Sequence, residues 1–173
     1  MTTLARAGWI AFASLLLLAG SAAAQPAKLG CTSERSANGS QTLHCATAIT
    51  IVTESGAKFE LRDRNRDGHV DSVELSNKAL LLEVPKKPGG NQFEVVTPQA
   101  IAAVRGTKWA VDAVDGKTSV FVVDGRVSVA RPAGRGSVVL GPGDGVDVEA
   151  TGELIVKRWP PARVAALLAR LGQ

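Results

Sequence analysis

The stretch KWAVDAVDGKTSVFVVDGRVSVA, residues 108–130, decides the fold class of this chain. Apolar and polar residues alternate through it, and Asp-Gly pairs at 115–116 and 124–125 separate the alternating runs. Alternation is typical of strands with one buried face, and Asp-Gly between two such runs is a strong hairpin signal because both residues tolerate positive φ. We therefore predict a three-stranded meander over residues 108–130. The residues expected on its buried face are Trp109, Val111, Ala113, Val127 and Val129.

Short strands are also expected on both sides of this stretch. Downstream, a glycine turn at 141–145 separates alternating or apolar runs. The predicted strands there are SVVL (137–140), VDVEA (146–150) and LIVK (154–157). Upstream, residues 48–62 are rich in β-branched residues and are broken by Ser55-Gly56, which predicts a β-hairpin. Ser76-Asn77 is expected to be a turn before a strand over 79–84, which Pro85 closes. This spacing predicts an all-β fold, a rolled sheet or jelly-roll-like β-sandwich.

The C-terminal segment WPPARVAALLARLGQ, residues 159–173, predicts a helix instead. Pro161 stands near its start, as helices permit, and Gly172 ends it. The residues expected on one apolar face are Val164, Leu167, Leu168 and Leu171, with Arg163 and Arg170 off that face. We expect the helix to cover one open end or edge of the β domain. The alternative is a docking helix for a partner or a membrane, although two arginines in a short helix argue against stable membrane binding.

The N-terminal segment has the pattern of a secretory signal peptide. Arg6 precedes an apolar run over 9–19, and small residues lead to an expected cleavage after Ala24. The alternative is an uncleaved anchor. We expect a periplasmic or secreted protein of 25–173 without stable membrane insertion. Its net charge falls from +4 to +3 because Arg6 is lost. The sequence has neither clustered basic residues nor the aromatic residues on which bases stack, so we do not expect nucleic-acid binding.

The two cysteines, Cys31 and Cys45, are expected to form a disulfide in an oxidising compartment. Closing such a loop stabilises a fold by about 3 kcal/mol in the chain-entropy model. The alternative is a metal site that also uses His44, but no fourth ligand is evident.

Residues 63–74, DRNRDGHVDSVE, match a twelve-residue EF-hand calcium loop. Gly68 stands at the sixth position, where the chain must turn sharply. The predicted metal ligands are Asp63, Asn65, Asp67, the carbonyl of His69, Asp71 and Glu74. The flanks predict strands rather than the two helices of an EF-hand, and the interleaved arginines oppose a cation. Two interpretations remain: a weak structural calcium site, or a turn in which Asp and Asn bond their own backbone.

No enzyme is expected, because the residues that common catalytic sites need are not arranged for them. The two histidines, His44 and His69, stand beside a cysteine and inside the acidic loop. There is no G-x-S-x-G, and GPGDG lacks the G-K-[ST] of a phosphate loop. The carboxylates concentrate in the calcium-like loop, where metal or turn chemistry explains their spacing.

Three segments resemble the FecR domain family, named for a periplasmic regulator of iron uptake. TPQAIAAVRGTKWAV (97–111) resembles its T-P-x-A-x-A-A-V-R-G-T-x-[aromatic]-x-V signature, and the likeness continues in VFVVDGRVSV (120–129) and VVLGPGDGVDV (138–148). The resemblance, over 93–158, implies a secreted, non-enzymatic β domain with a rolled sheet. It also implies kinship with founders that sense an outer-membrane transporter and signal to a sigma factor. This chain shows no anti-sigma segment or transmembrane helix, so we expect an exported stand-alone member.

Arg105 lies between apolar residues within the first of these segments. We expect its guanidinium to be partly buried and paired with a carboxylate, from Asp112 or Asp124. The alternative is that Arg105 contacts an acidic group of a partner.

These observations predict four regions: a signal peptide (1–24), an N-terminal β region with the cysteines and the acidic loop (25–90), a FecR-like β core (91–158) and a helix (159–173). We expect a binding or scaffold module that acts on a protein partner in the cell envelope, with calcium as a structural ion. One alternative is a calcium-responsive binding module. The other is a periplasmic regulator that acts on a membrane sensor through the C-terminal helix.

Overall fold

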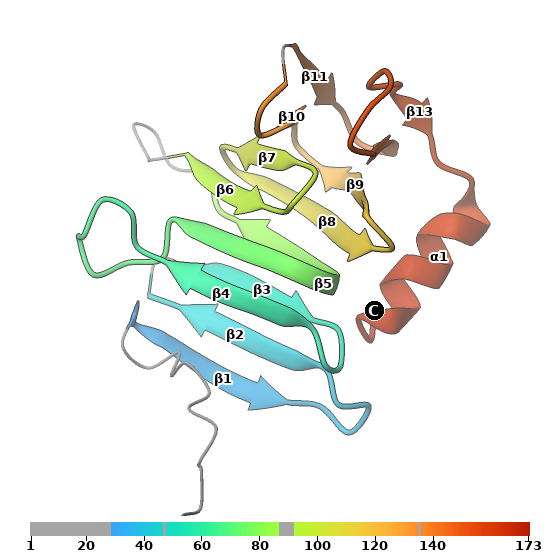
Figure 1. Cartoon of the computed structure of the whole chain (residues 1–173). Coiled ribbons are helices and arrows are strands. Elements are labelled where there is room, and N and C mark those ends of the chain that lie inside the picture. The colour runs from blue at the N-terminus through green and yellow to red at the C-terminus, as the bar shows by residue number, and fades with distance from the viewer. Residues whose placement is uncertain (1–28, 47, 87–91, 135) are drawn as a thin grey trace, which may run out of the picture.

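The computed structural model describes residues 29–46, 48–86, 92–134 and 136–173 of the chain. The predicted signal peptide over 1–24 lies outside these residues. Within them, thirteen strands form one curled sheet, and one helix lies against it (Figure 1). This confirms the predicted all-β fold with a short C-terminal helix. The elements are β1 (Cys31–Arg35), β2 (Gln41–Cys45), β3 (Ile49–Thr53), β4 (Lys58–Arg62), β5 (Ser72–Val84), β6 (Phe93–Val96), β7 (Ile101–Val104), β8 (Thr107–Val114), β9 (Lys117–Asp124), β10 (Val127–Ala130), β11 (Ser137–Leu140), β12 (Asp144–Val148), β13 (Lys157–Arg158) and α1 (Pro161–Arg170).

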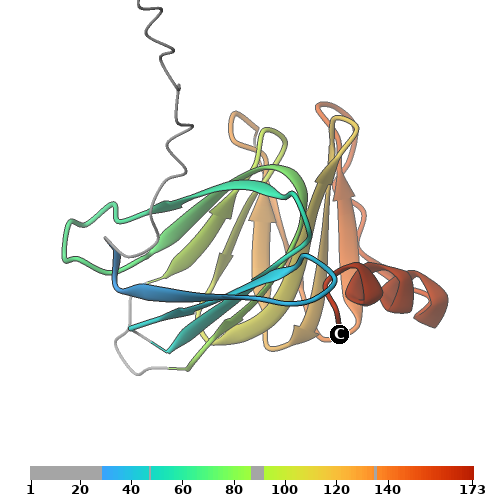
Figure 2. The ribbon, with the colours of Figure 1, turned by 90° about the horizontal axis from the view of Figure 1, so that it is seen from below.

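The curled sheet has two halves that share the thirteen-residue strand β5. Sheet A runs β1-β2-β3-β5-β8-β9-β12-β13, and sheet B runs β4-β5-β6-β7-β10-β11. All described pairings are antiparallel except that of β5 with β6. The halves curl toward each other and enclose the core (Figure 2). Trp109 and Phe93 are its largest fully buried side chains, with ring centroids 6.2 Å apart in an edge-to-face arrangement.

The predicted meander over 108–130 is wrong in its last pairing. β8 and β9 form the expected hairpin, but β10 pairs with β7 and β11 in sheet B. Residues 101–114 and 117–130 are instead two long strands, each bent from one half of the sheet into the other. The bends lie at Gly106 (φ +71°) and Gly125 (φ +88°), where the two backbones approach so closely that a Cβ on Gly125 would lie 2.8 Å from the Gly106 carbonyl oxygen.

The hairpin predicted inside residues 48–62 is also wrong. β3 and β4 run in the same direction and both pair antiparallel with β5, so they are two halves of another bent strand. The turn expected at Ser76-Asn77 is instead a bulge inside β5. Phe59 pairs with Leu75 and the preceding residue pairs with Asn77, so Ser76 is the extra residue. The bulge bends β5 to follow its bent partner.

The strand predicted at 137–140 exists as β11. The strand predicted at 146–150 exists as β12, but it begins and ends two residues earlier, at Asp144 and Val148. The strand predicted at 154–157 does not form as expected. β13 consists of Lys157–Arg158 alone, and the two apolar residues before it are exposed, Ile155 by 54% and Val156 by 38%. Apolar composition therefore predicted a strand where the chain leaves the sheet.

Helix α1 confirms the predicted apolar face but not the predicted place. Pro161 is its first residue, and Gly172 follows its end with φ +74°. Leu167 and Leu171 are buried against residues of β5, β8 and β9, so the helix covers the outer face of sheet A rather than an end or edge (Figure 2). In the part of the chain that the structure describes, no helix is long and apolar enough to cross a bilayer.

The predicted disulfide is confirmed. Cys31 and Cys45 lie opposite each other on β1 and β2, and their sulfur atoms are bonded. The bond fixes the strand at one edge of sheet A, and it removes both thiols that the alternative metal site with His44 requires.

Candidate functional site

The sheet contains two bent hairpins: in the first, the bent strand β3-β4 pairs with β5, and in the second, the bent strand β7-β8 pairs with β9-β10. The acidic loop lies at the tip of the first, between β4 and β5, so strands flank it on both sides as predicted. Its side chains accept hydrogen bonds from its own backbone. The Asp63 carboxylate accepts from the N–H groups of Asp67 (3.1 Å) and Gly68 (2.8 Å), and the Asp67 carboxylate accepts from the N–H of His69 (2.9 Å). Val70 is buried and anchors the loop to the core.

Of the remaining acidic ligands predicted, Asp71 also bonds the backbone of the loop, whereas Glu74 does not. Asp71 accepts hydrogen bonds from the backbone N–H groups of Arg64 and Asn65. Glu74 lies on β5 and pairs with Arg62 at 2.9 Å, and this hydrogen bond lowers the pKa of Glu74. Among the described residues, no three His, Cys, Asp or Glu side chains gather in an arrangement that holds a metal ion. The geometry is that of a self-bonded turn, and calcium binding stays a prediction.

Arg105 is exposed, which contradicts the expectation that it is partly buried and paired. It lies at the bend between β7 and β8. Asp112 pairs with Arg170 instead, and Asp124 lies 3.9 Å from the Lys86 ammonium. A bend that projects its side chain outward therefore leaves the Arg105 guanidinium available to solvent.

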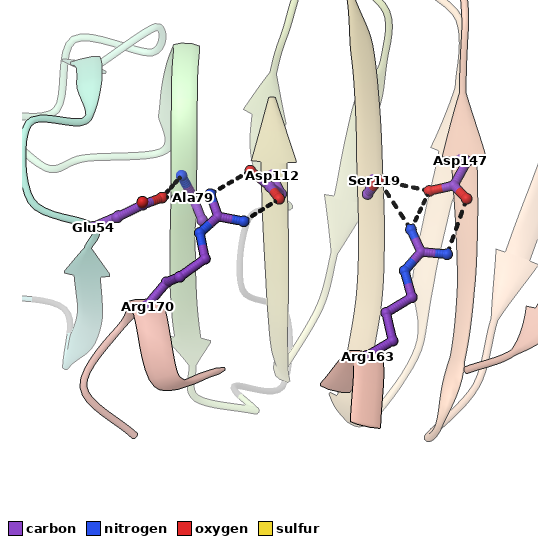
Figure 3. A network of polar contacts seen from close by, with 7 residues as sticks. All are labelled: Glu54, Ala79, Asp112, Ser119, Asp147, Arg163 and Arg170. Atoms are coloured by element: carbon purple, nitrogen blue, oxygen red, sulfur yellow. Dashed lines mark hydrogen bonds and ion pairs between the residues drawn. The ribbon is translucent and has the colours of Figure 1, made fainter. Parts of the chain in front are cut away.

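Arg170 fastens the C-terminal end of α1 to sheet A (Figure 3). It donates to both carboxylate oxygens of Asp112, at 2.7 and 3.0 Å, and to Glu54 at 2.6 Å. Glu54 also accepts the backbone N–H of Ala79 at 3.1 Å. The hydrogen bonds to Asp112 and Glu54 raise the pKa of Arg170, which shows that the two carboxylates stabilise its charge. The contact joins the helix to β8, β5 and the bend between β3 and β4.

Arg163 fastens the N-terminal end (Figure 3). Its guanidinium donates to the two carboxylate oxygens of Asp147 at 2.5 and 3.0 Å. The guanidinium carbon also lies 3.5 Å from the centroid of the Trp159 ring, and that ring stacks on Phe121 with the two centroids 5.2 Å apart. Ser119 donates to Asp147 at 2.6 Å. Burial alone would raise the pKa of Asp147, but the hydrogen bonds from Arg163 and Ser119 outweigh it and the pKa is lowered.

Sequence reasoning placed the two arginines off the apolar face but missed their partners. A signal was present: Asp112 and Asp147 each stand between apolar residues of a predicted strand, and Arg163 and Arg170 are about two helical turns apart. Two arginines on the helix and two aspartates of opposite charge on the strands predict that the helix packs on those strands.

A groove of about 220 Å³ lies beside this N-terminal fastening point, between β12 and the segment that returns from it to α1. It is lined by Gly145, Asp147, Glu149, Thr151, Gly152, Glu153, Ile155, Lys157, Trp159 and Arg163. The lining is mostly polar and charged, and no sequence motif predicted the groove.

The described residues show no group of side chains arranged as in a common catalytic site. The side chains of His44 and His69 are exposed and make no hydrogen bond to a serine or an acid there.

Comparisons with known proteins identify the family of the chain. A family model described as "FecR protein" matches residues 35–128, more than half of the chain. The match takes in the first bent hairpin and the second as far as residue 128, within β10. It begins well before the predicted start of the likeness at residue 93 and ends before the segment over 138–148. No protein of curated function matches the chain.

Two solved crystal structures share the fold, and both are described as a "putative anti-sigma factor" from Parabacteroides distasonis. One has 24% identity and a TM-score of 0.62, with 80% of this chain covered. The other has 22% identity and a TM-score of 0.61, with 79% covered. The chain spans 64% of the length of each.

Proposed function

The chain belongs to the FecR protein family, and on that basis we propose that it is an exported, non-enzymatic regulatory module that works by binding another protein in the cell envelope. The observation that carries this proposal is the family match over residues 35–128. The fold shared with two proteins described as anti-sigma factors supports a role in signalling.

Export to an oxidising compartment rests on two features of the chain. The first is the signal-peptide pattern over 1–24, and the second is the disulfide between Cys31 and Cys45. Disulfides persist in the periplasm and outside the cell and are rare in the cytosol. The first feature rests on hydropathy and the second on the register that places Cys31 opposite Cys45 in β1 and β2, so they are separate observations that support the same compartment.

The proposed contact with the partner includes Arg105. A buried, paired arginine would need no further explanation, but this side chain is exposed at a bend. Two more exposed bases stand at the same pair of bends. A Cβ on Gly106 would touch Lys86, and the Arg126 carbonyl accepts a hydrogen bond from Thr107 at 3.0 Å. We therefore expect the bends to face an acidic surface of the partner.

Site-specific photo-crosslinking in living cells tests this proposal. The full chain with its own leader is expressed with a photo-crosslinking amino acid at position 105, and a matched chain has it at Arg35, an exposed arginine of β1. The proposal expects a crosslinked envelope protein from position 105 only, and less of it in an Arg126→Glu background. Equal products from both positions, or none from either, would reject the contact at Arg105.

A regulator that acts through its C-terminal helix is the finer form of the same proposal. The two arginine contacts support it, because they hold α1 on the sheet by polar bonds that a partner could exchange. Deleting residues 159–173 is a poor test, since it would expose Leu81 and Phe121, which α1 covers. Arg163→Gln and Arg170→Gln keep the helix and remove its charge contacts, so altered partner capture in these variants tests the helix itself.

A calcium-responsive module is the second candidate, favoured by the oxygen-rich loop. The donor types fit calcium, but Glu74 faces Arg62, so the loop must exchange partners to bind the ion. Isothermal calorimetry on the exported chain beside Asp67→Ala and Glu74→Ala decides this. Saturable heat that is lost in both variants supports a calcium site, whereas no heat up to several millimolar rejects it.

A further inference from the structure

The hydrogen-bonded ladder at the outer edge of β12 stops early. β12 pairs with β13 only at Asp144↔Arg158 and Gly145↔Lys157. Beyond that point the chain turns and returns at a distance from β12, and the groove of about 220 Å³ lies between the two segments. Strand β13 therefore covers the first two residues of β12 and leaves the rest of that edge of sheet A without a strand beside it.

The uncovered part of this edge presents backbone groups to the groove. Trp159 donates its N–H to the Gly143 carbonyl at 3.1 Å. In an antiparallel ladder the groups that face one neighbour recur at every second residue, at Gly145 and then at Asp147. Asp147 pairs with Ser119 of β9 on one side, but on the β13 side the ladder has no described partner for it. The Glu149 carbonyl accepts the Arg131 side chain, at 2.9 Å, and that side chain also donates to the Thr151 carbonyl at 3.2 Å. Unpaired groups on an edge strand are a template for an added strand.

The side chains around the groove specify the chemistry of what fits. Glu149 and Glu153 are exposed, and neither has an ion-pair partner among the described residues. The Asp147 and Arg163 charges satisfy each other, which leaves Lys157 as the one further base in the lining. Ile155 presents an apolar side chain that is 54% exposed. Two acids against one base, beside an apolar residue, complement a segment that alternates basic and apolar residues.

From these observations we propose that the free edge of β12 binds a short extended segment of the partner protein by strand addition. The segment pairs with the backbone of Asp147, directs a Lys or Arg toward Glu149 and Glu153, and lays an apolar side chain on Ile155. This inference rests on the proposed function, because it names a surface that the partner uses. A second copy of this chain could also add a strand, and the experiment below separates that outcome.

The test uses two synthetic eight-residue peptides, one alternating Lys and Val and one alternating Glu and Val, with the exported chain labelled with ¹⁵N. The proposal expects saturable amide shifts from the Lys peptide that are confined to residues 146–157, and none there from the Glu peptide. Glu149→Lys combined with Glu153→Lys should weaken the Lys peptide about tenfold, since charge complementarity at an interface rim sets much of its selectivity. Lys157→Glu is the matched control and should strengthen binding.

Three results would overturn the inference. They are no saturable shift, shifts of equal size at the β1 or β11 edges, and a concentration-dependent dimer that the double variant abolishes. Crosslinking from position 105 separates this failure from failure of the proposed function. If position 105 still captures its partner while the β12 edge does not respond, the regulatory proposal stands and the edge site falls.

Discussion

Two Asp-Gly pairs lie in the same bent hairpin and do different things. At Asp115-Gly116 both residues have positive φ, +54° and +70°, and the chain reverses between β8 and β9. At Asp124-Gly125 only Gly125 has positive φ, +88°, and the chain continues from sheet A into sheet B. The first pair makes the turn that its composition predicts, and the second bends a strand without reversing it.

The surroundings of the two glycines explain the difference. A Cβ at Gly116 would have nothing within 4 Å, because the turn projects into solvent. A Cβ at Gly125 would lie 2.8 Å from the Gly106 carbonyl oxygen and 2.8 Å from the Thr107 hydroxyl. The dipeptide thus permits an unusual φ in both places, but contact between two bends decides whether the strand turns back or crosses over.

Gly125→Ala should have the largest effect of the substitutions that probe this contrast. A positive φ costs an L-residue about 1–2 kcal/mol, and here the added methyl also meets backbone atoms that cannot move without opening the sheet. We expect a loss of at least about 3 kcal/mol in the free energy of unfolding, measured by urea denaturation with the disulfide intact. If Gly125→Ala costs no more than Gly116→Ala, the close approach of the two bends is wrong.

Thr107→Val should have the next largest effect, because Thr107 joins the two bends. Its buried hydroxyl donates to the Arg126 carbonyl at 3.0 Å, and valine keeps the shape while leaving that carbonyl without its donor. We expect a loss of about 1–2 kcal/mol in the same denaturation experiment. Thr107→Ser, which keeps the hydroxyl, is the control; a loss as large as that of valine would assign the effect to packing.

Gly116→Ala should cost less, about 1 kcal/mol, since only the positive φ opposes it and no atom stands in the way. Hydrogen exchange sharpens the contrast further. We expect this variant to open β8 and β9 only near the turn, whereas Gly125→Ala should also weaken protection in β7 and β10. A global loss of protection from Gly116→Ala would contradict the local role of this turn.

Much of the fold could be predicted from alternation, because a residue's face in a strand depends only on its own chain. The inward side chains Trp109, Val111 and Val127 follow in this way. The apolar face of α1 follows likewise from helical periodicity, and the pairing of Cys31 with Cys45 follows because the chain has two cysteines. Strand partners do not, since they depend on where the chain bends. Positive φ at Gly106 and Gly125, and in β5 the bulge at Ser76 with positive φ at Lys78 just after it, set those bends through contacts between segments.

The candidate site was harder to predict for the same reason. Arg105 was expected to be buried because its sequence neighbours are apolar, yet the bend at Gly106 turns it outward. The groove beside β12 arises where a predicted strand, LIVK, leaves the ladder. Both proposed contact surfaces therefore lie where local pattern and observed structure disagree, which is where strain and function are commonly found.

The smallest predicted effect comes from making the same Asp→Asn substitution in each of the two Asp-Gly pairs. It is the prediction that separates the two pairs most directly. Asp115→Asn should stabilise the chain by a few tenths of a kcal/mol, because asparagine tolerates positive φ and Asn-Gly is a favoured hairpin turn. Asp124→Asn should not, because Asp124 is an extended residue of β9 whose side chain is 71% exposed and only 3.9 Å from Lys86, a pair that is worth little in water. The readout is the difference between the two melting temperatures, since each shift alone is close to experimental error. Equal shifts of the same sign would mean that the two Asp-Gly pairs share one backbone geometry, and the crossing of β9 into β10 would have to be abandoned.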